Sequence, residues 1–323
     1  MIRLKDTMQQ PVSFSHEAAS ADQSDRAAVT RKTPAYADRW WFTEDGLRLY
    51  ARDYAASAGR VRLPVVCLHG VTRNSADFEE VAPYISRLDR RVIVPDLRGR
   101  GLSEYDANPS NYHLWTYAKD VLSLCDALGI GRAIFVGSSM GGLVAMVLST
   151  LRPNLVVSAV LNDVGPVLSP KGLARLNAFA AMKPVAFRNW HDASVFVAEQ
   201  NKLTFPNYTQ AEWLRLARRA FIKGKDGMLR LAYDSRITET FRSLTTASAN
   251  HDLDPCYASL AQDRKILLVR GALSDVLDAS AVKAMAVQAR HFTRVDIDYV
   301  GHAPQLTEPQ AFTAVCDFME SQG

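Results

Sequence analysis

The stretch that decides the fold is AIFVGSSMGGLVAMVL, residues 133 to 148. The apolar, partly β-branched run from Ala133 to Val136 predicts a buried strand. The longer apolar run from Leu143 to Leu148 predicts a helix. The glycines and serines between these two runs therefore mark a tight strand-to-helix turn.

Within this turn, Gly137 and Gly141 flank Ser139 at two residues before and two after, which makes the pattern G-x-S-x-G. In a nucleophile elbow of this pattern the central side chain is exposed on a strained turn, and small neighbours let strand and helix approach closely. An ordinary glycine-rich turn or a phosphate-binding loop are the alternatives. A phosphate loop requires G-x-x-x-x-G-K-[ST], and no lysine follows here.

The composition is that of an ordinary globular enzyme, with 323 residues, 48% hydrophobic and 22% charged residues. A net charge of +4 without a basic, aromatic-interleaved stripe gives no support for a nucleic-acid partner. No apolar run reaches the roughly 18 residues of a membrane span. The four cysteines lie far apart, which argues against a zinc site and for free thiols in a reducing compartment: Cys67, Cys125, Cys256 and Cys316.

The chain outside this stretch divides into three parts. Residues 1–33 have no apolar signal-like segment and predict a flexible N-terminal arm, so a cytoplasmic location is expected by default. Residues 34–162 and 256–323 alternate apolar strands with amphipathic helices, which indicates βαβ units and a mostly parallel sheet. The alternation lapses over 163–255, which predicts a helical cap inserted into the α/β core.

The expected elements follow from this alternation. Asp45-Gly46 in WWFTEDGLRLYARDY, residues 40–54, predicts a hairpin. The other expected strands lie within 63–70, 90–101, 155–165, 265–275 and 293–303. The expected helices lie at 75–88, 115–130, 210–222, 279–290 and 308–321.

A serine hydroxyl needs a base to take its proton, and the base needs a carboxylate to hold it. Among seven histidines, only His302 follows a late strand in a loop that reaches the edge of the sheet, so His302 is the expected base. His69 ends a strand before a glycine and is expected to be structural. Two aspartates follow strands, Asp163 in LNDVG and Asp275 in RGALSD, and chain order permits either as the acid.

Five motifs in order resemble the capped, esterase-like branch of the α/β-hydrolase family over roughly residues 39 to 321: CLHGV, PDLRGRGLS, GSSMGG, GALSD and GHAPQLTEP. The resemblance implies an α/β-hydrolase fold, a mostly parallel central sheet flanked by helices, with an inserted helical cap. It implies a triad of Ser139, Asp275 and His302, because the family carries the acid in the G-x-x-S-D element. It also implies an oxyanion hole made by the backbone amides of Val71 and Met140.

Some residues of this chain differ from those of particular branches of the family, and these differences limit the reactions that can be expected. Haloalkane dehalogenases and epoxide hydrolases carry Asp where this chain has Ser139, and many carbon–carbon bond hydrolases follow the histidine with tryptophan where Ala303 stands. The leading hypothesis is hydrolysis of a small ester, thioester or lactone through an acyl-enzyme on Ser139, with no metal or cofactor. The alternatives are a carbon–carbon bond hydrolase of a ring-cleavage product and a ligand-sensing protein on the same fold.

The expected partner is a small-molecule acyl substrate, with no nucleic acid and no membrane. The oligomeric state is left open, with a homodimer as one option. Residues 163–250 carry thirteen Lys and Arg against seven Asp and Glu. Most of these cations, including Arg215, Arg218 and Arg219, are expected to face solvent. Arg73 is a candidate for binding a substrate carboxylate, and Arg98 and Arg100 are expected to be structural.

Overall fold

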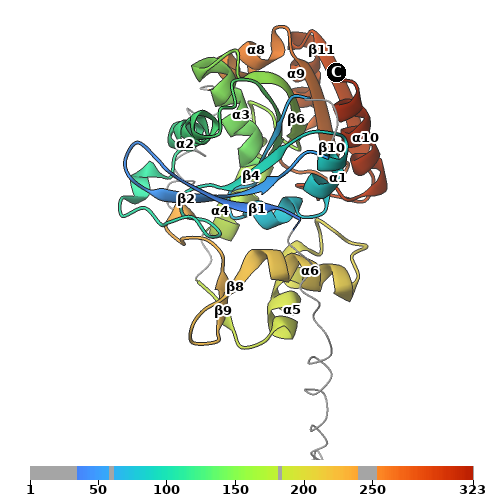
Figure 1. The fold of residues 1–323 in the computed structure, drawn as a ribbon. Coiled ribbons are helices and arrows are strands. Elements are labelled where there is room, and N and C mark those ends of the chain that lie inside the picture. The colour runs from blue at the N-terminus through green and yellow to red at the C-terminus, as the bar shows by residue number, and fades with distance from the viewer. Residues whose placement is uncertain (1–34, 58–61, 181–183, 239–252, 323) are drawn as a thin grey trace, which may run out of the picture. The chain divides into compact units, whose positions relative to one another are not determined.

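The computed structural model describes residues 35–57, 62–180, 184–238 and 253–322. Its centre is an eight-stranded sheet with the strand order β1-β2-β4-β3-β5-β6-β10-β11 (Figure 1). β1 pairs antiparallel with β2, and β2 antiparallel with β4, whereas the other neighbours are parallel. The strands are β1 (Ala37–Phe42), β2 (Arg48–Tyr54), β3 (Val65–Leu68), β4 (Val92–Asp96), β5 (Ala133–Ser138), β6 (Val156–Asn162), β10 (Lys265–Gly271) and β11 (His291–Ile297).

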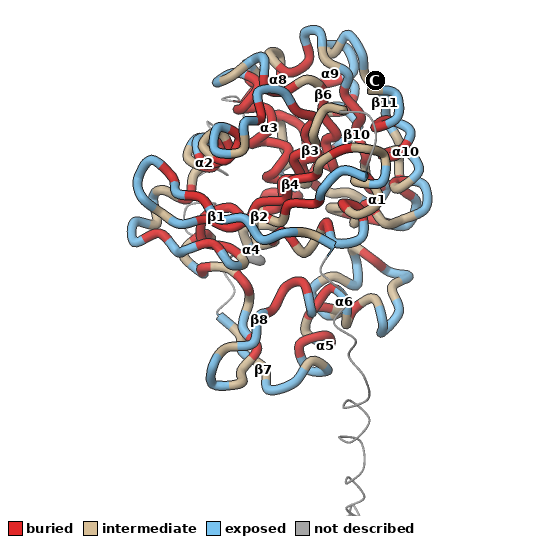
Figure 2. Tube along the Cα trace, in the orientation of Figure 1, coloured by how far each residue is buried: buried red, intermediate tan, exposed pale blue. Residues whose placement is uncertain are grey.

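The strands are short apolar runs because both faces of the parallel part of the sheet are covered by helices. In β3, Val66 and Leu68 join one hydrophobic cluster, and Val65 and Cys67 join a second cluster on the opposite face. This is the two-residue alternation of a strand. Figure 2 shows the buried residues concentrated along these central strands.

Helices from both halves of the chain cover the two faces of the sheet (Figure 1). Buried residues of α2, α3, α8 and α9 belong to the first cluster, and those of α1 and α10 belong to the second. The helices are α1 (Val81–Arg87), α2 (Leu114–Ala127), α3 (Met140–Leu151), α8 (Asp254–Ala261), α9 (Ala279–Gln288) and α10 (Pro309–Glu320), with short 3₁₀ turns η2 (Ser75–Phe78) and η3 (Pro109–Asn111). The predicted hairpin, strands and helices of the core are confirmed to within a few residues, except that the single helix expected at 75–88 is the 3₁₀ turn η2 followed by the shorter α1.

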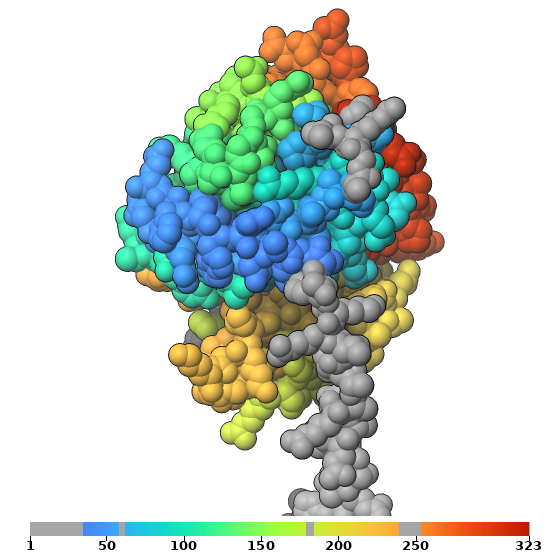
Figure 3. All heavy atoms as spheres, viewed as in Figure 1, coloured from blue at the N-terminus to red at the C-terminus, as the bar shows by residue number. Residues whose placement is uncertain are grey.

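Between β6 and α8 the chain forms a smaller lobe below the core in Figure 3. Its helices are α4 (Pro170–Ala180), α5 (Trp190–Asn201) and α6 (Gln210–Ala220). It also contains an antiparallel sheet of order β7-β9-β8, which the sequence did not predict: β7 (Ala186–Phe187), β8 (Phe221–Lys223) and β9 (Leu229–Leu231). Strands of two or three residues are too short for a detectable alternation.

The domain boundaries at 33, 162 and 255 stay predictions, and the expected N-terminal arm, residues 1–33, lies outside the described residues. We refer to the segment from α4 to β9 as the insertion. In the described part of the chain, no helix combines the length and apolar character needed to cross a membrane.

All four cysteines are buried and unpaired, and they lie in different elements: Cys67 in β3, Cys125 in α2, Cys256 in α8 and Cys316 in α10. Burial raises the pKa of the Cys67 thiol far above its usual value and that of Cys125 to about 12. These thiols therefore remain protonated inside the fold.

Candidate active site

The turn between β5 and α3 has the geometry of a nucleophile elbow. Ser139 has a φ of 49°, a left-handed conformation that is strained for a residue with a side chain. A Cβ added to Gly137 would collide with the backbone of Gly142, and one added to Gly141 would collide with the backbone of Leu68. Strand and helix therefore touch here as the sequence predicted, and only glycine fits at both flanking positions.

Ser139 and His302 are brought together from elements 163 residues apart. The Ser139 hydroxyl lies 2.8 Å from Nε2 of His302, and Nδ1 of His302 lies 2.8 Å from Oδ2 of Asp163. Asp163 directly follows β6, has a φ of 55° and is fully buried. Its other oxygen, Oδ1, accepts a hydrogen bond from the amide of Gly271 at 3.1 Å. Because a carboxylate can only accept, Nδ1 carries the proton and Nε2 is free to face the serine.

The expected pairing of Asp275 with His302 is wrong. Both oxygens of Asp275 accept hydrogen bonds from Arg175 in α4, at 2.6 and 2.8 Å. Burial opposes ionisation of Asp275, but the Arg175 guanidinium outweighs it and lowers the pKa of this carboxyl. Asp275 therefore anchors the insertion to the loop after β10, and Asp163, the alternative on sequence grounds, takes the place beside the imidazole.

The assignment of the oxyanion hole to the backbone amides of Val71 and Met140 stays a prediction, and the free hydrogen-bonding capacity that both amides have within the described residues is compatible with it. Met140 is the first residue of α3, so its amide has no partner within the helix. Val71 lies in the loop after β3, and no acceptor for its amide is present in the parts of the chain that the structure describes. Val71 and Ser139 line the same cavity. Backbone amides without an acceptor in the protein are the kind of donor that stabilises a developing negative charge.

His69 supports the loop that carries Val71. Its Nδ1 lies 2.9 Å from the carbonyl oxygen of Gly70, and its Nε2 accepts from the amide of Leu97 at 3.1 Å. Burial, with a smaller contribution from the charge of Arg100, lowers the pKa of His69 to about 3. His69 is therefore neutral and structural, as the sequence indicated.

The cavity above Ser139 has a volume of about 180 Å³ and lies between the core and the insertion. Ser139 and His302 form its floor, and Phe196, Leu216 and Leu231 of the insertion supply apolar lining. A second cavity, of about 510 Å³, shares Phe196, Leu231 and Tyr233 with the first. The insertion thus forms part of the wall of both cavities.

Two arginines line the smaller cavity, and each is paired with a carboxylate. Arg73 forms a two-bond ion pair with Asp77, with Nε–Oδ2 2.8 Å and Nη2–Oδ1 2.5 Å, and Arg175 forms the pair with Asp275. Arg73 therefore lines the cavity but shares its charge with Asp77, and its role in binding a substrate carboxylate stays a prediction. In the sequence, only the four-residue spacing of Arg73 and Asp77 hints at this ion pair.

Two of the three arginines of α6 are exposed as predicted, and the third is buried. Arg215 and Arg218 are exposed, as expected, whereas Arg219 is 5% exposed and forms ion pairs with Glu79 and Glu80 of the core. The prediction that Arg219 faces solvent is wrong, because α6 turns this side of the helix toward the core. Within the described ranges, no cluster of three His, Cys, Asp or Glu residues has the arrangement of a metal site.

Comparisons with known proteins agree with this fold. The family model of the alpha/beta hydrolase fold matches residues 64–309. The 3-hydroxybutyrate-oligomer hydrolase of Cupriavidus necator is 33% identical over 249 residues, which cover 76% of this chain and 84% of that protein. The 2-(acetamidomethylene)succinate hydrolase of Mesorhizobium japonicum is 32% identical over 217 residues, covering 66% of this chain and 72% of that protein.

A crystal structure of an alpha/beta hydrolase from Novosphingobium aromaticivorans superposes with a TM-score of 0.82 at 37% sequence identity, and the match covers 88% of this chain and 98% of that chain. The two relatives are named as hydrolases, and the Novosphingobium aromaticivorans structure has the fold described above. On this evidence the chain belongs to the alpha/beta hydrolase fold family and is an enzyme of the hydrolase class.

Proposed function

We propose that the protein hydrolyses small carboxylic esters through an acyl-enzyme formed on Ser139. The observation that supports this proposal most strongly is the unbroken hydrogen-bonded chain from Ser139 through His302 to Asp163. Nucleophile, base and orienting acid stand in the order that acyl transfer requires. The carboxylate of Asp163 accepts a hydrogen bond from Nδ1 of His302, so Nδ1 keeps its proton while Nε2 accepts the proton of Ser139.

In the first half-reaction the Ser139 oxygen attacks the ester carbonyl carbon while His302 Nε2 takes the hydroxyl proton. The carbonyl oxygen becomes an oxyanion, which the amides of Val71 and Met140 stabilise by about 3 kcal/mol each. Collapse of this intermediate expels the alcohol, and His302 returns the proton to it. Water then attacks the acyl-enzyme, and the same residues release the carboxylic acid.

We further propose that the preferred ester carries a free carboxylate. A 3-hydroxybutyrate oligomer ends in a carboxylate, and 2-(acetamidomethylene)succinate carries two, so both relatives are named for anionic substrates. In this chain Arg73 and Arg175 line the cavity that holds Ser139. Each already has a carboxylate partner, so a substrate carboxylate would share or replace Asp77 or Asp275 as that partner. The rest of the lining is largely apolar, which suits a short hydrocarbon backbone.

The nucleophile is tested with a fluorophosphonate probe and an activated ester. One adduct on Ser139 is expected, and Ser139→Ala is expected to remove both the adduct and the turnover. Ser138 is the matched control, because Ser138→Ala removes the neighbouring hydroxyl and leaves the elbow serine. Labelling of Ser138 would contradict the proposal, and stoichiometric binding without turnover would favour the ligand-sensing alternative.

The substrate class is tested by comparing a 3-hydroxybutyrate dimer with its methyl ester. The free acid is expected to have the higher kcat/KM, and the advantage is expected to shrink as salt rises because the attraction is partly screened. Arg73→Met is expected to reduce the preference for the free acid. Arg218→Met is the control, since Arg218 is exposed over Trp190 and does not line the cavity. An equal or better rate on the methyl ester would contradict a carboxylate preference.

A further inference from the structure

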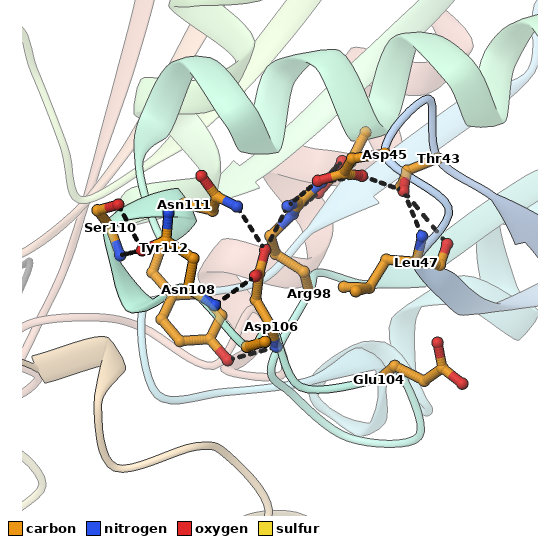
Figure 4. Close-up of polar contacts among 12 residues, drawn as sticks. Thr43, Asp45, Leu47, Arg98, Glu104, Asp106, Asn108, Ser110, Asn111 and Tyr112 are labelled. Carbon is orange, nitrogen blue, oxygen red and sulfur yellow. Dashed lines mark hydrogen bonds and ion pairs between the residues drawn. The ribbon is translucent and has the colours of Figure 1, made fainter.

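The loop after β4 contains two buried arginines two residues apart, with opposite surroundings. Arg98 is held by three carboxylates: Asp45 at 2.8 Å, Asp106 at 2.6 Å and Asp120 at 2.5 Å. Figure 4 shows Asp45 and Asp106 converging on its guanidinium. Arg100 is equally buried, at 0% exposure, and no carboxylate in the described part of the chain pairs with it.

The contacts of Arg100 lead to the two residues assigned to the oxyanion hole. Its Nε donates to the carbonyl oxygen of Val71 at 2.6 Å, and its Nη2 lies 3.6 Å from the sulfur of Met140. The same Nη2 donates to the hydroxyl of Tyr117 at 3.1 Å, and the guanidinium lies 4.6 Å from the centre of that ring. One side chain therefore touches both the loop after β3 and the first residue of α3.

A buried cation without a carboxylate is expensive to desolvate, because carbonyl and phenol oxygens replace its water only in part. Its uncompensated charge is correspondingly effective at short range in this low-dielectric interior. The charge of Arg100 contributes to lowering the pKa of His69, which holds the carbonyl of Gly70 in the same loop. The electrostatic effect of Arg100 thus reaches the backbone on which the oxyanion donors lie.

The backbone around Arg100 is also bonded to the segment that directly follows β9 of the insertion. Gly101 donates to the carbonyl oxygen of Ala232 at 2.8 Å, and Asp234 donates to that of Gly99 at 2.8 Å. Arg100 and Tyr233 face each other across this short antiparallel bridge. Tyr233 lines both cavities, so the wall of the substrate cavity and the support of the oxyanion loop are joined at Arg100.

We propose that Arg100 is a positioning residue for the oxyanion hole: it fixes the loop of Val71 against Met140 and adds positive charge behind the two donors. The inference rests on the proposed serine hydrolase function and adds a residue to it. Because the oxyanion carries full charge only near the transition state, Arg100 serves the chemical step more than substrate binding.

The test is Arg100→Met, which keeps the length and apolar stem of the side chain but removes the charge and the donors. The expected result is a fall in kcat of about 10²-fold with KM within a few-fold, comparable to the loss of one oxyanion donor. The inhibition constant of a trifluoromethyl ketone, which forms an oxyanion on the serine, is expected to rise in parallel. Binding of the carboxylic acid product, which forms no such oxyanion, is expected to change little.

Arg98→Lys is the matched control from the same loop, because Arg98 is buried but contacts neither Val71 nor Met140. It is expected to lower the melting temperature and to leave the kcat of the folded enzyme unchanged. Arg100→Lys keeps the charge but loses the planar fork, and a kcat loss of about tenfold is expected. This variant decides the question if Arg100→Met does not fold.

Folded Arg100→Met with wild-type kcat and an unchanged ketone inhibition constant would overturn the inference. So would wild-type values in Arg100→Lys when Arg100→Met is unfolded, or an equal kcat loss in Arg98→Lys. These outcomes differ from failure of the proposed function, in which the wild-type protein itself would neither turn over esters nor react with the fluorophosphonate.

Discussion

Two aspartates at the ends of neighbouring strands, Asp163 after β6 and Asp275 after β10, have different surroundings. The side chain of Asp163 has no exposure and binds the imidazole of His302, while that of Asp275 is 18% exposed and binds Arg175 of the insertion. The first carboxylate contacts the proposed catalytic base, and the second pairs with a side chain of the insertion. Both aspartates lie at the carboxyl edge of the sheet, so this position alone does not identify which of them is the proposed catalytic acid.

The largest expected effect comes from Asp163→Asn. An asparagine amide can donate to Nδ1 and so favours the tautomer with its proton on Nε2, which cannot accept the serine proton. By comparison with the same change in a serine protease triad, kcat is expected to fall about 10⁴-fold, and KM is expected to change little. Steady-state kinetics on an activated ester measures this. A larger loss in Asp275→Asn would return the role of the acid to Asp275.

Asp275→Asn is expected to act mainly on substrate binding. Loss of the ion pair with Arg175 loosens α4 and part of the cavity wall, so a rise in KM of up to about tenfold is expected, with kcat within about threefold. Arg175→Met removes the same pair from the other side and is expected to give the same pattern on a neutral activated ester, which has no carboxylate for Arg175 to bind. A kcat loss in Asp275→Asn without one in Arg175→Met would show that the carboxylate acts on the chemistry directly.

The double variant Asp163→Asn/Asp275→Asn sharpens the comparison. The charge of His302 contributes to lowering the pKa of Asp275, so the two side chains interact electrostatically and Asp275 remains as a carboxylate in Asp163→Asn. The kcat loss caused by Asp275→Asn is expected to be roughly threefold larger in the Asp163→Asn background than in the wild-type enzyme, because a screened charge at this range stabilises the imidazolium weakly once Asp163 is neutral. If the losses simply multiply as in the single variants, Asp275 has no part in the residual activity.

The smallest expected effect is on stability. Arg175 is 41% exposed, so solvent screening limits the pair to about 0.5 kcal/mol. The pKa of Asp275 is lowered by folding, so its contribution is fully present above the unfolded value of 3.8 and is lost as the pH falls through the lower folded value. Urea unfolding of wild type and Asp275→Asn is expected to differ equally at pH 7 and pH 5. A difference that disappears already at pH 5 would contradict the lowered pKa.

The elbow could be predicted because close approach of strand and helix leaves only glycine at positions 137 and 141, and that constraint is visible as spacing. The core strands could be predicted because burial on both faces demands apolar runs. Which of Asp163 and Asp275 contacts His302 could not be predicted from the sequence. The answer depends on a φ of 55° at Asp163 and on Arg175, which lies 100 residues away from Asp275. The burial of Arg219 likewise depends on Glu79 and Glu80, which the sequence of α6 does not contain.

The four buried thiols can be used to measure local unfolding of this protein without an added label. A disulfide reagent reacts with a thiolate, so Cys67, Cys125, Cys256 and Cys316 are protected as long as β3, α2, α8 and α10 remain packed. Each modification site, identified by mass after a timed exposure, marks the fluctuation that released that element. If the four sites react at one common rate, the two faces of the sheet open together. Separate rates would rank the elements by local stability in the native protein, without a denaturant and without an added label.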